Sequence, residues 1–139
     1  MLLVVMVEEP SAANVLHSLL PKLIPPGSAY QILVHRGKSE LRKSIPRKLH
    51  EWRVPDSRFL ILHDQDAADC RALKQDLIAL CAASGRPDAV VRIVCRELES
   101  WYFGDLDALE SAFGERSVRS IRGKAAYRIP DKIVSPARE

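Results

Sequence analysis

Short apolar runs alternate with longer segments of helical periodicity along this 139-residue chain, and the alternation limits the folds open to it. Strands that are apolar throughout are typical of a sheet covered on both faces. Strands that alternate with helices favour right-handed βαβ units. The apolar runs are Leu2 to Val7, Tyr30 to Val34, Arg58 to His63 and Ala89 to Cys95. We therefore predict a three-layer α/β domain with a mostly parallel four-stranded sheet and helices on both faces.

Helices are expected in the segments between these strands. Ser11 can cap the first helix, which Pro21 should kink. The second helix, from Lys38 onward, should be interrupted or restarted at Pro46. A third is expected after Asp66, and a short fourth over residues 106–113.

Length and composition indicate one ordinary globular domain. The chain is 47% apolar and 28% charged, which is typical of soluble proteins. The apolar run at the N-terminus is too short to span a membrane and lacks the flanks of a secretion signal, so we expect a cytoplasmic protein without a membrane anchor. The three cysteines are widely spaced, so we expect them to be reduced and to lie in the core. We predict an α/β domain over residues 1–113 and a basic tail over 114–139, consistent with truncation of a longer protein.

Basic residues gather in the segment between Arg36 and Arg53, although the net charge of +3 does not identify a nucleic-acid binder. Such a helix can track a phosphate backbone, or it can be a solvated face opposite an apolar one. Both interpretations stay open. The candidate nucleic-acid contacts are Lys38, Arg42, Lys43 and Arg47.

Acidic residues follow three of the four predicted strands. In open α/β sheets, ligands bind beyond the carboxyl ends of the strands. Clustered carboxylates repel each other, and a hard divalent cation with oxygen ligands relieves that repulsion. The carboxylates are those of Glu8 and Glu9, Asp64 and Asp66, and Glu97 and Glu99. Together they predict a site for Mg²⁺ or Mn²⁺ at this edge of the sheet.

Several of these residues have a structural alternative. Asp64 and Asp66 lie on the same side of an extended backbone and can share a cation, but either can instead cap the helix that follows. His63 can orient a phosphate or a water, or serve as a structural hydrogen-bonding residue. The aromatic residues 101–103 can stack on bases, although core packing is the favoured interpretation.

The order of these motifs resembles the Toprim fold of topoisomerases, primases and OLD-type nucleases. The segment from Val7 to Ala13 is similar to the first Toprim motif, with Glu8 at the position of its acidic residue and Glu9 where a glycine is usual. The whole chain more closely resembles the DUF4276 family of Toprim-like proteins. The matching segments are His35-Arg-Gly-Lys38, Leu62-His-Asp-Gln-Asp66, Cys95-Arg-Glu-Leu-Glu-Ser-Trp101 and Phe103-Gly-Asp105.

This resemblance implies a metal site more firmly than a substrate. It implies that Glu8 is a general base or acid and also a metal ligand, that Asp64 and Asp66 are catalytic metal ligands, and that Glu97 or Glu99 adds a ligand. We accordingly expect a Mg²⁺-dependent phosphodiester-cleaving hydrolase that acts on nucleic acid in a phage-defence context. The alternative is a non-catalytic Toprim-like module that binds a metal or nucleotide and partners an ATPase. A homodimer is left open.

Overall fold

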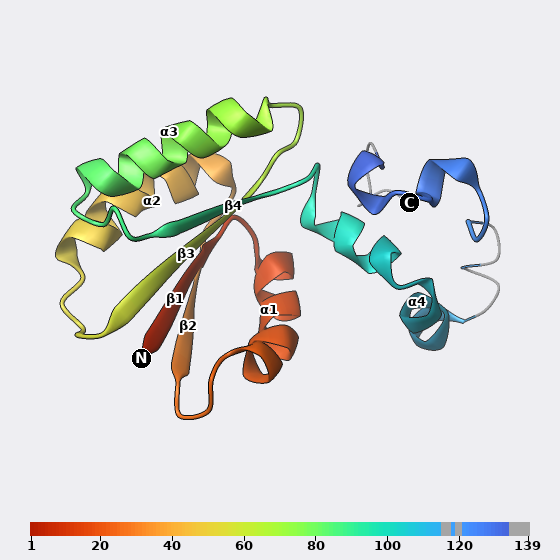
Figure 1. Ribbon diagram of the computed structural model, residues 1–139, viewed down its shortest axis with the longest axis horizontal. Coiled ribbons are helices and arrows are strands. Elements are labelled where there is room, and N and C mark those ends of the chain that lie inside the picture. Colours follow the sequence, from red (N-terminus) through yellow and green to blue (C-terminus); the bar gives the residue numbers. More distant parts are fainter. Residues whose placement is uncertain (115–117, 119–120, 134–139) are drawn as a thin grey trace. The chain divides into compact units, whose positions relative to one another are not determined.

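The computed structural model describes residues 1–114, 118 and 121–133, and Figure 1 labels their helices and strands. Contacts divide the chain into two compact units. The first unit contains Met1–His63 and Asp69–Ile93. The second contains Asp64–Ala68 and the described part of Val94–Glu139. The boundary predicted between residues 113 and 114 stays a prediction.

Four parallel strands form the sheet, in the order β2-β1-β3-β4. β1 pairs with β2 on one side and with β3 on the other, both in parallel register. The strands and their crossover helices are β1 (Leu2–Val7), α1 (Pro10–Leu23), β2 (Ala29–Val34), α2 (Lys38–Glu51), β3 (Ser57–Asp64), α3 (Cys70–Ala83) and β4 (Val90–Val94). The predicted α/β class and four-stranded sheet are confirmed.

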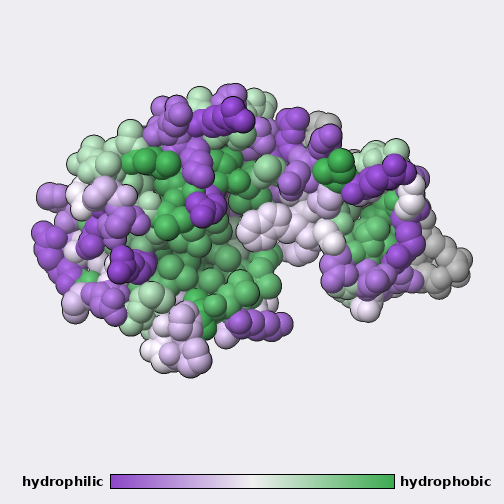
Figure 2. Space-filling view, viewed as in Figure 1, coloured by the Kyte–Doolittle hydropathy of each residue, from purple (hydrophilic) through white to green (hydrophobic). Residues whose placement is uncertain are grey.

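Each face of the sheet has its own apolar core. α1 lies on one side of the sheet, and α2 and α3 lie on the other (Figure 1). Side chains of β1 point alternately to the two faces of the sheet. Val5 and Val7 pack against apolar residues of α1, whereas Val4 and Met6 pack against apolar residues of α2 and α3. Figure 2 shows hydrophobic residues of the first unit gathered over the sheet. These two cores make the three layers that the sequence predicted.

The boundaries of two helices differ from expectation. α2 runs without a break through Pro46, because Ile45 and Leu49 are buried on either side of it and their packing outweighs the one backbone hydrogen bond that proline cannot donate. α1 begins at Pro10, whose fixed φ suits the first turn, and Ser11 does not cap it.

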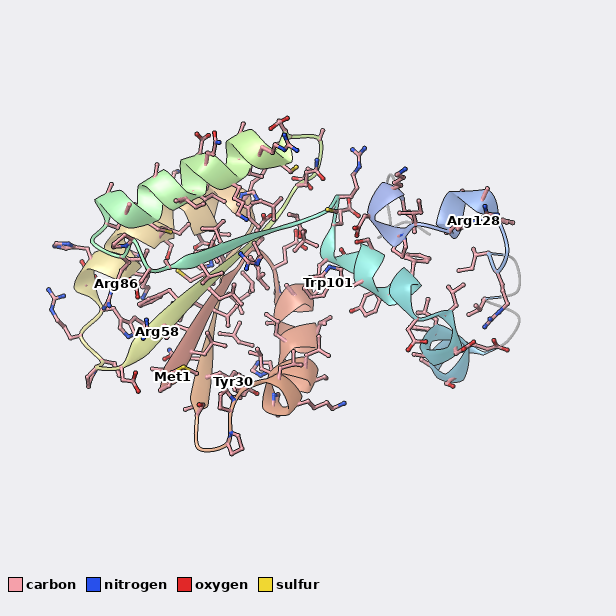
Figure 3. All side chains as sticks on the ribbon, viewed as in Figure 1. Met1, Tyr30, Arg58, Arg86, Trp101 and Arg128 are labelled. Atoms are coloured by element: carbon pink, nitrogen blue, oxygen red, sulfur yellow. The ribbon has the colours of Figure 1, made fainter. Side chains whose placement is uncertain are left out.

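A cation–π contact lies at the end of the sheet where the strands begin. The guanidinium of Arg86 lies 5.1 Å from the centre of the Phe59 ring, and its Nη2 donates to the Trp52 carbonyl at 3.3 Å. Trp52 in turn meets Phe59 edge to face at 5.6 Å and donates its indole N–H to Ser57. Figure 3 labels Arg86 and the neighbouring Arg58. These contacts fasten α2 to the start of β3.

The second unit consists of short helical pieces. They are η1 (Leu98–Gly104), α4 (Leu106–Phe113), η2 (Ala125–Tyr127) and η3 (Pro130–Lys132). α4 has the predicted bounds, and Asp105 caps it by accepting from the Ala108 N–H. The sequence of residues 129–136 predicts an extended tail, which is wrong for η3, a 3₁₀ turn; residues 134–136 lie outside the described residues.

Two predictions of core packing are wrong in part. Trp101 and Tyr102 are exposed, whereas Phe103 is half-buried with its ring 5.7 Å from that of Tyr127. Cys81 is buried as predicted, but Cys70 is exposed at the start of α3. Over the part of the chain that the structure describes, no helix is both long enough and apolar enough to cross a membrane.

Truncating Leu77 should weaken the core far more than truncating its neighbour Ile78. Leu77 is fully buried between α3 and the sheet, and Ile78 is 43% exposed. Leu77→Ala removes buried methyl groups and leaves a cavity, which costs about 2–5 kcal/mol of unfolding free energy. Ile78→Ala should cost less than about 1 kcal/mol. Urea denaturation of both variants checks this difference, and equal losses would contradict the burial assignment.

Candidate functional site

A buried pair of titratable side chains joins two neighbouring strands of the first unit. Glu8 follows β1 directly, and His63 lies on β3, the parallel neighbour of β1. His63 Nδ1 is 2.9 Å from Glu8 Oε1, and the two side chains are only 3% and 10% exposed. A hydrogen bond in such a low-dielectric place is stronger than the same contact in water. The structure therefore brings a secondary sequence candidate, His63, against the first predicted catalytic acid.

The turn after β2 is fastened to the end of β1. The Gly37 N–H donates to the Glu8 carbonyl at 2.8 Å, and Gly37 has a φ of 97°, which glycine adopts without strain. His35 Nδ1 lies 2.8 Å from the Val7 carbonyl. Because a carbonyl only accepts, Nδ1 holds a proton, and Nε2 is the imidazole's basic nitrogen when the ring is neutral. The sequence analysis places His35 in a family-matching segment but does not predict its contact with β1, which depends on strand pairing.

Within the second unit, the segment after β3 is hydrogen-bonded to the segment after β4. The Gln65 N–H donates to the Val94 carbonyl and the Asp66 N–H to the Arg96 carbonyl, both at 2.9 Å. The Arg96 N–H donates back to the Gln65 side chain at 3.3 Å. These three bonds hold the Asp64–Ala68 segment in a defined position beside Arg96. Gln65, which lies between the two predicted metal ligands, therefore has a structural role.

Two residues of this paired segment have strained backbones. Asp66 has a φ of 50° and Arg96 a φ of 63°, in the left-handed region that non-glycine residues disfavour. At Arg96 this conformation costs about 1–2 kcal/mol relative to a relaxed one, whereas aspartate adopts the region more readily. Such strain persists only where surrounding contacts impose it, and it is concentrated at functional sites. The hydrogen bond between Asp66 and Arg96 is one such contact.

The alternative role of Asp64 and Asp66 as helix caps does not apply. The N-cap of α3 is Asp69, whose carboxylate accepts from the Ala72 N–H at 2.8 Å. Asp64 is the last residue of β3, and Asp66 lies in the loop beyond it. Neither residue therefore caps this helix.

The remaining predicted carboxylates are spread over both units. Glu97 is the N-cap residue of η1 without a side-chain cap bond, Glu99 lies in its first turn, and Glu9 is exposed before α1. Among the residues that the structure describes, no three His, Cys, Asp or Glu side chains form a group able to hold a metal ion. Mg²⁺ is usually held by one or two carboxylates with waters and substrate phosphates, so the carboxylate oxygens of Asp64 and Asp66 suit it.

Two of the four predicted nucleic-acid contacts line a groove. Lys43 and Arg47, together with Lys48, form its α2 side, and residues 32–35 form its β2 side. The groove has a volume of about 540 Å³. Lys38 and Arg42 lie on the same helix but do not line it. Part of the basic face of α2 therefore forms one side of a groove.

The surroundings of Cys81 and Tyr102 raise the pKa values of their side chains. Burial raises the pKa of the Cys81 thiol, so this cysteine is a protonated core residue at neutral pH. Burial, and secondly the Glu99 carboxylate, raise the pKa of the Tyr102 phenol. Tyr102 therefore stays a neutral hydrogen-bond donor beside Glu99.

Removing the Glu8 carboxylate should destabilise the first unit. Glu8→Ala deletes the buried acceptor that His63 Nδ1 contacts, which costs about 1–3 kcal/mol. Glu9→Ala, at the exposed neighbour, should change the unfolding free energy by no more than about 0.5 kcal/mol. Chemical denaturation of the two variants measures the difference. Equal stabilities would show that the pair contributes nothing to folding.

The strain at Arg96 can be measured with a matched pair of variants. Arg96→Ala and Arg96→Gly both remove the guanidinium, and they differ in the cost of a left-handed backbone. Arg96→Gly should therefore be more stable than Arg96→Ala by about 1 kcal/mol. Thermal denaturation compares them. A glycine variant that is less stable than the alanine variant would contradict the left-handed conformation.

Comparison with known proteins gives one match. Residues 7–138 match the family model described as a domain of unknown function, DUF4276. No curated protein and no solved structure matches the chain. The family match covers nearly the whole sequence, including both units and all the candidate carboxylates, and the chain therefore belongs to the DUF4276 family.

Proposed function

We propose that this protein is a Mg²⁺-dependent phosphodiester-cleaving enzyme that acts on nucleic acid, with a Toprim-like site. The main support is the buried Glu8–His63 pair, since it lies at the carboxyl ends of two neighbouring parallel strands, where open α/β sheets bind ligands. Glu8 is also the residue that matches the acid of the first Toprim motif.

In the proposed site, each acidic residue has its own task. Asp64 and Asp66 hold the cation, with Glu97 or Glu99 as a further ligand. Bound Mg²⁺ or Mn²⁺ would activate the attacking water and stabilise the leaving oxygen. Glu8 takes up or delivers a proton, and its contact with His63 fixes the orientation of its carboxylate. A single orientation matters because proton transfer requires hydrogen-bond geometry.

The strained segment supports the role of Asp66. The backbone of Asp66, left-handed and held through its N–H by the Arg96 carbonyl, is already fixed before a ligand arrives. Enzyme sites benefit from such preorganisation because it avoids an ordering cost during the reaction. Lys38 and Arg42, in the first two turns of α2 and outside the groove, would hold the phosphate backbone of the substrate.

A second function is also supported by the Glu8–His63 contact. A carboxylate engaged by a histidine inside the protein can stabilise the fold without taking part in chemistry. On this alternative, the protein is a non-catalytic Toprim-like module that binds a metal or nucleotide and partners an ATPase. Both candidates retain the phage-defence context as part of the proposal.

A cleavage assay with the full chain separates the two functions. Labelled single- and double-stranded DNA and RNA are incubated with Mg²⁺, Mn²⁺ or EDTA. We expect metal-dependent cleavage that Asp64→Asn reduces at least about a hundredfold, because the neutral amide is a poorer ligand for a hard cation. The matched control is Asp76→Asn, which removes an exposed carboxylate from α3 and should cleave like the parent protein.

The opposite outcomes are equally specific. Cleavage that survives both EDTA and Asp64→Asn would contradict the proposed metal site. No cleavage of any substrate, together with a rise in melting temperature on adding Mg²⁺ that Asp64→Asn abolishes, would favour the non-catalytic module.

A further inference from the structure

β2 forms a free edge of the sheet. Over the described residues it pairs only with β1. The Ala29 N–H donates to Met1 and the His35 N–H to Val7, so alternate residues from 29 to 35 turn their backbone groups toward β1. The residues between them, Tyr30, Ile32 and Val34, therefore turn their backbone N–H and C=O groups away from the sheet. Tyr30, near the start of this edge, is labelled in Figure 3.

The basic groove lies along this free edge. Ile32 packs with the α1 core and Leu33 with the α2 and α3 core, so the two point to opposite faces of the sheet. Both nevertheless line the same groove. Because the backbone groups of Ile32 and Val34 turn away from β1, the groove that these residues line runs along this edge. Val34, also in the groove, is 45% exposed, so this edge is open in the first unit.

The α2 side of the groove is positively charged. Lys43, Arg47 and Lys48 line it, and Glu40 is the only acidic residue among the described residues that line the groove. The Glu40 carboxylate already accepts the Arg36 backbone N–H. Within the described part of the chain, none of the three basic residues forms an ion pair with a carboxylate. The groove therefore has a surplus of positive charge.

We propose that this groove binds an extended acidic peptide segment of a partner protein, which adds as a strand beside β2. Peptide strands bind sheet edges through main-chain hydrogen bonds, and side-chain contacts supply the specificity. Side chains on one face of an extended peptide repeat about every 6.8 Å. Lys43 and Arg47 are four residues apart, which is about 6 Å along a helix. Acidic residues at alternate positions of the peptide match this spacing.

The other face of the added strand meets a different surface. Ile32 and the α1 core lie on that side of β2, and apolar side chains would cover them. The preferred peptide thus alternates acidic and apolar residues. Single-stranded nucleic acid fits less well, because such strands bind through stacking on aromatic rings. The described residues that line the groove include no Phe, Tyr or Trp.

Fluorescence anisotropy with the full chain tests the charge of the groove. The probe is a fluorescein-labelled Thr-Val-Glu-Val-Glu-Val-Thr peptide, measured without metal, so the result is independent of the proposed cleavage. Lys43→Glu/Arg47→Glu should weaken binding at least about tenfold through like-charge repulsion. Lys22→Glu/Arg71→Glu makes the same change in net charge at exposed positions outside the groove and should leave binding within about twofold.

A variant whose groove carries the opposite charge should bind a basic peptide. Lys43→Glu/Arg47→Glu should bind Thr-Val-Lys-Val-Lys-Val-Thr, which the parent protein should not bind. No binding of the acidic peptide by the parent protein would overturn the proposal. Tighter binding of labelled oligothymidylate, lost in Lys43→Glu/Arg47→Glu, would also overturn it and assign the groove to nucleic acid.

Variants at Val34 test strand addition itself. Val34→Pro removes an edge N–H that points away from β1, a position at which a sheet tolerates proline. It should fold, as circular dichroism would show, and should bind the acidic peptide at least about tenfold more weakly. Val34→Thr keeps the N–H and should bind like the parent protein. Unchanged binding by folded Val34→Pro would show that the peptide does not add as a strand.

Discussion

Complete burial of β1 is the constraint from which the rest of the first unit follows. Val4, Val5, Met6 and Val7 are all without solvent exposure. A strand in that position needs a paired strand on each side and a helix layer on each face, because its backbone groups and its side chains must both be satisfied without water. The βαβ crossovers provide both the neighbouring strands and the helix layers, since each crossover helix returns the chain to the end of the sheet where the next parallel strand begins.

Burial of β1 also explains why its polar end is organised. Glu8 follows four fully buried residues and is itself 8% exposed. A carboxylate in that place is unfavourable unless it has hydrogen-bonding partners, and His63 on the adjacent strand supplies one. The backbone carbonyl of Glu8 is met by the Gly37 N–H. The end of β1 is therefore held by both of its neighbours, and this rigidity is what the catalytic role proposed for Glu8 requires.

Much of this architecture could be predicted because short-range patterns encode it. The strand β1 and the helix α4 have the predicted bounds, since apolar runs and caps are local signals. Pro46 was misjudged because its local preference is outweighed by burial of Ile45 and Leu49, and burial depends on the tertiary fold. The pairing of Glu8 with His63 depends on strand order, and periodicity alone does not give strand order. The left-handed backbone of Arg96 likewise accompanies a long-range contact and leaves no trace in residue type, whereas aspartate is a residue type that adopts this region more often.

The free edge of β2 and the ends of the strands can serve separate purposes on one rigid sheet. β2 is hydrogen-bonded to β1 along its length, and its last bond reaches His35. A strand added outside β2 would use backbone groups that point away from β1, so it would extend the sheet without moving Glu8. Coupling between two sites requires an element with two arrangements whose balance both ligands shift. A fully paired parallel ladder is a poor candidate for such an element. Binding at the edge would therefore position a partner without altering the affinity of the strand ends for their ligand.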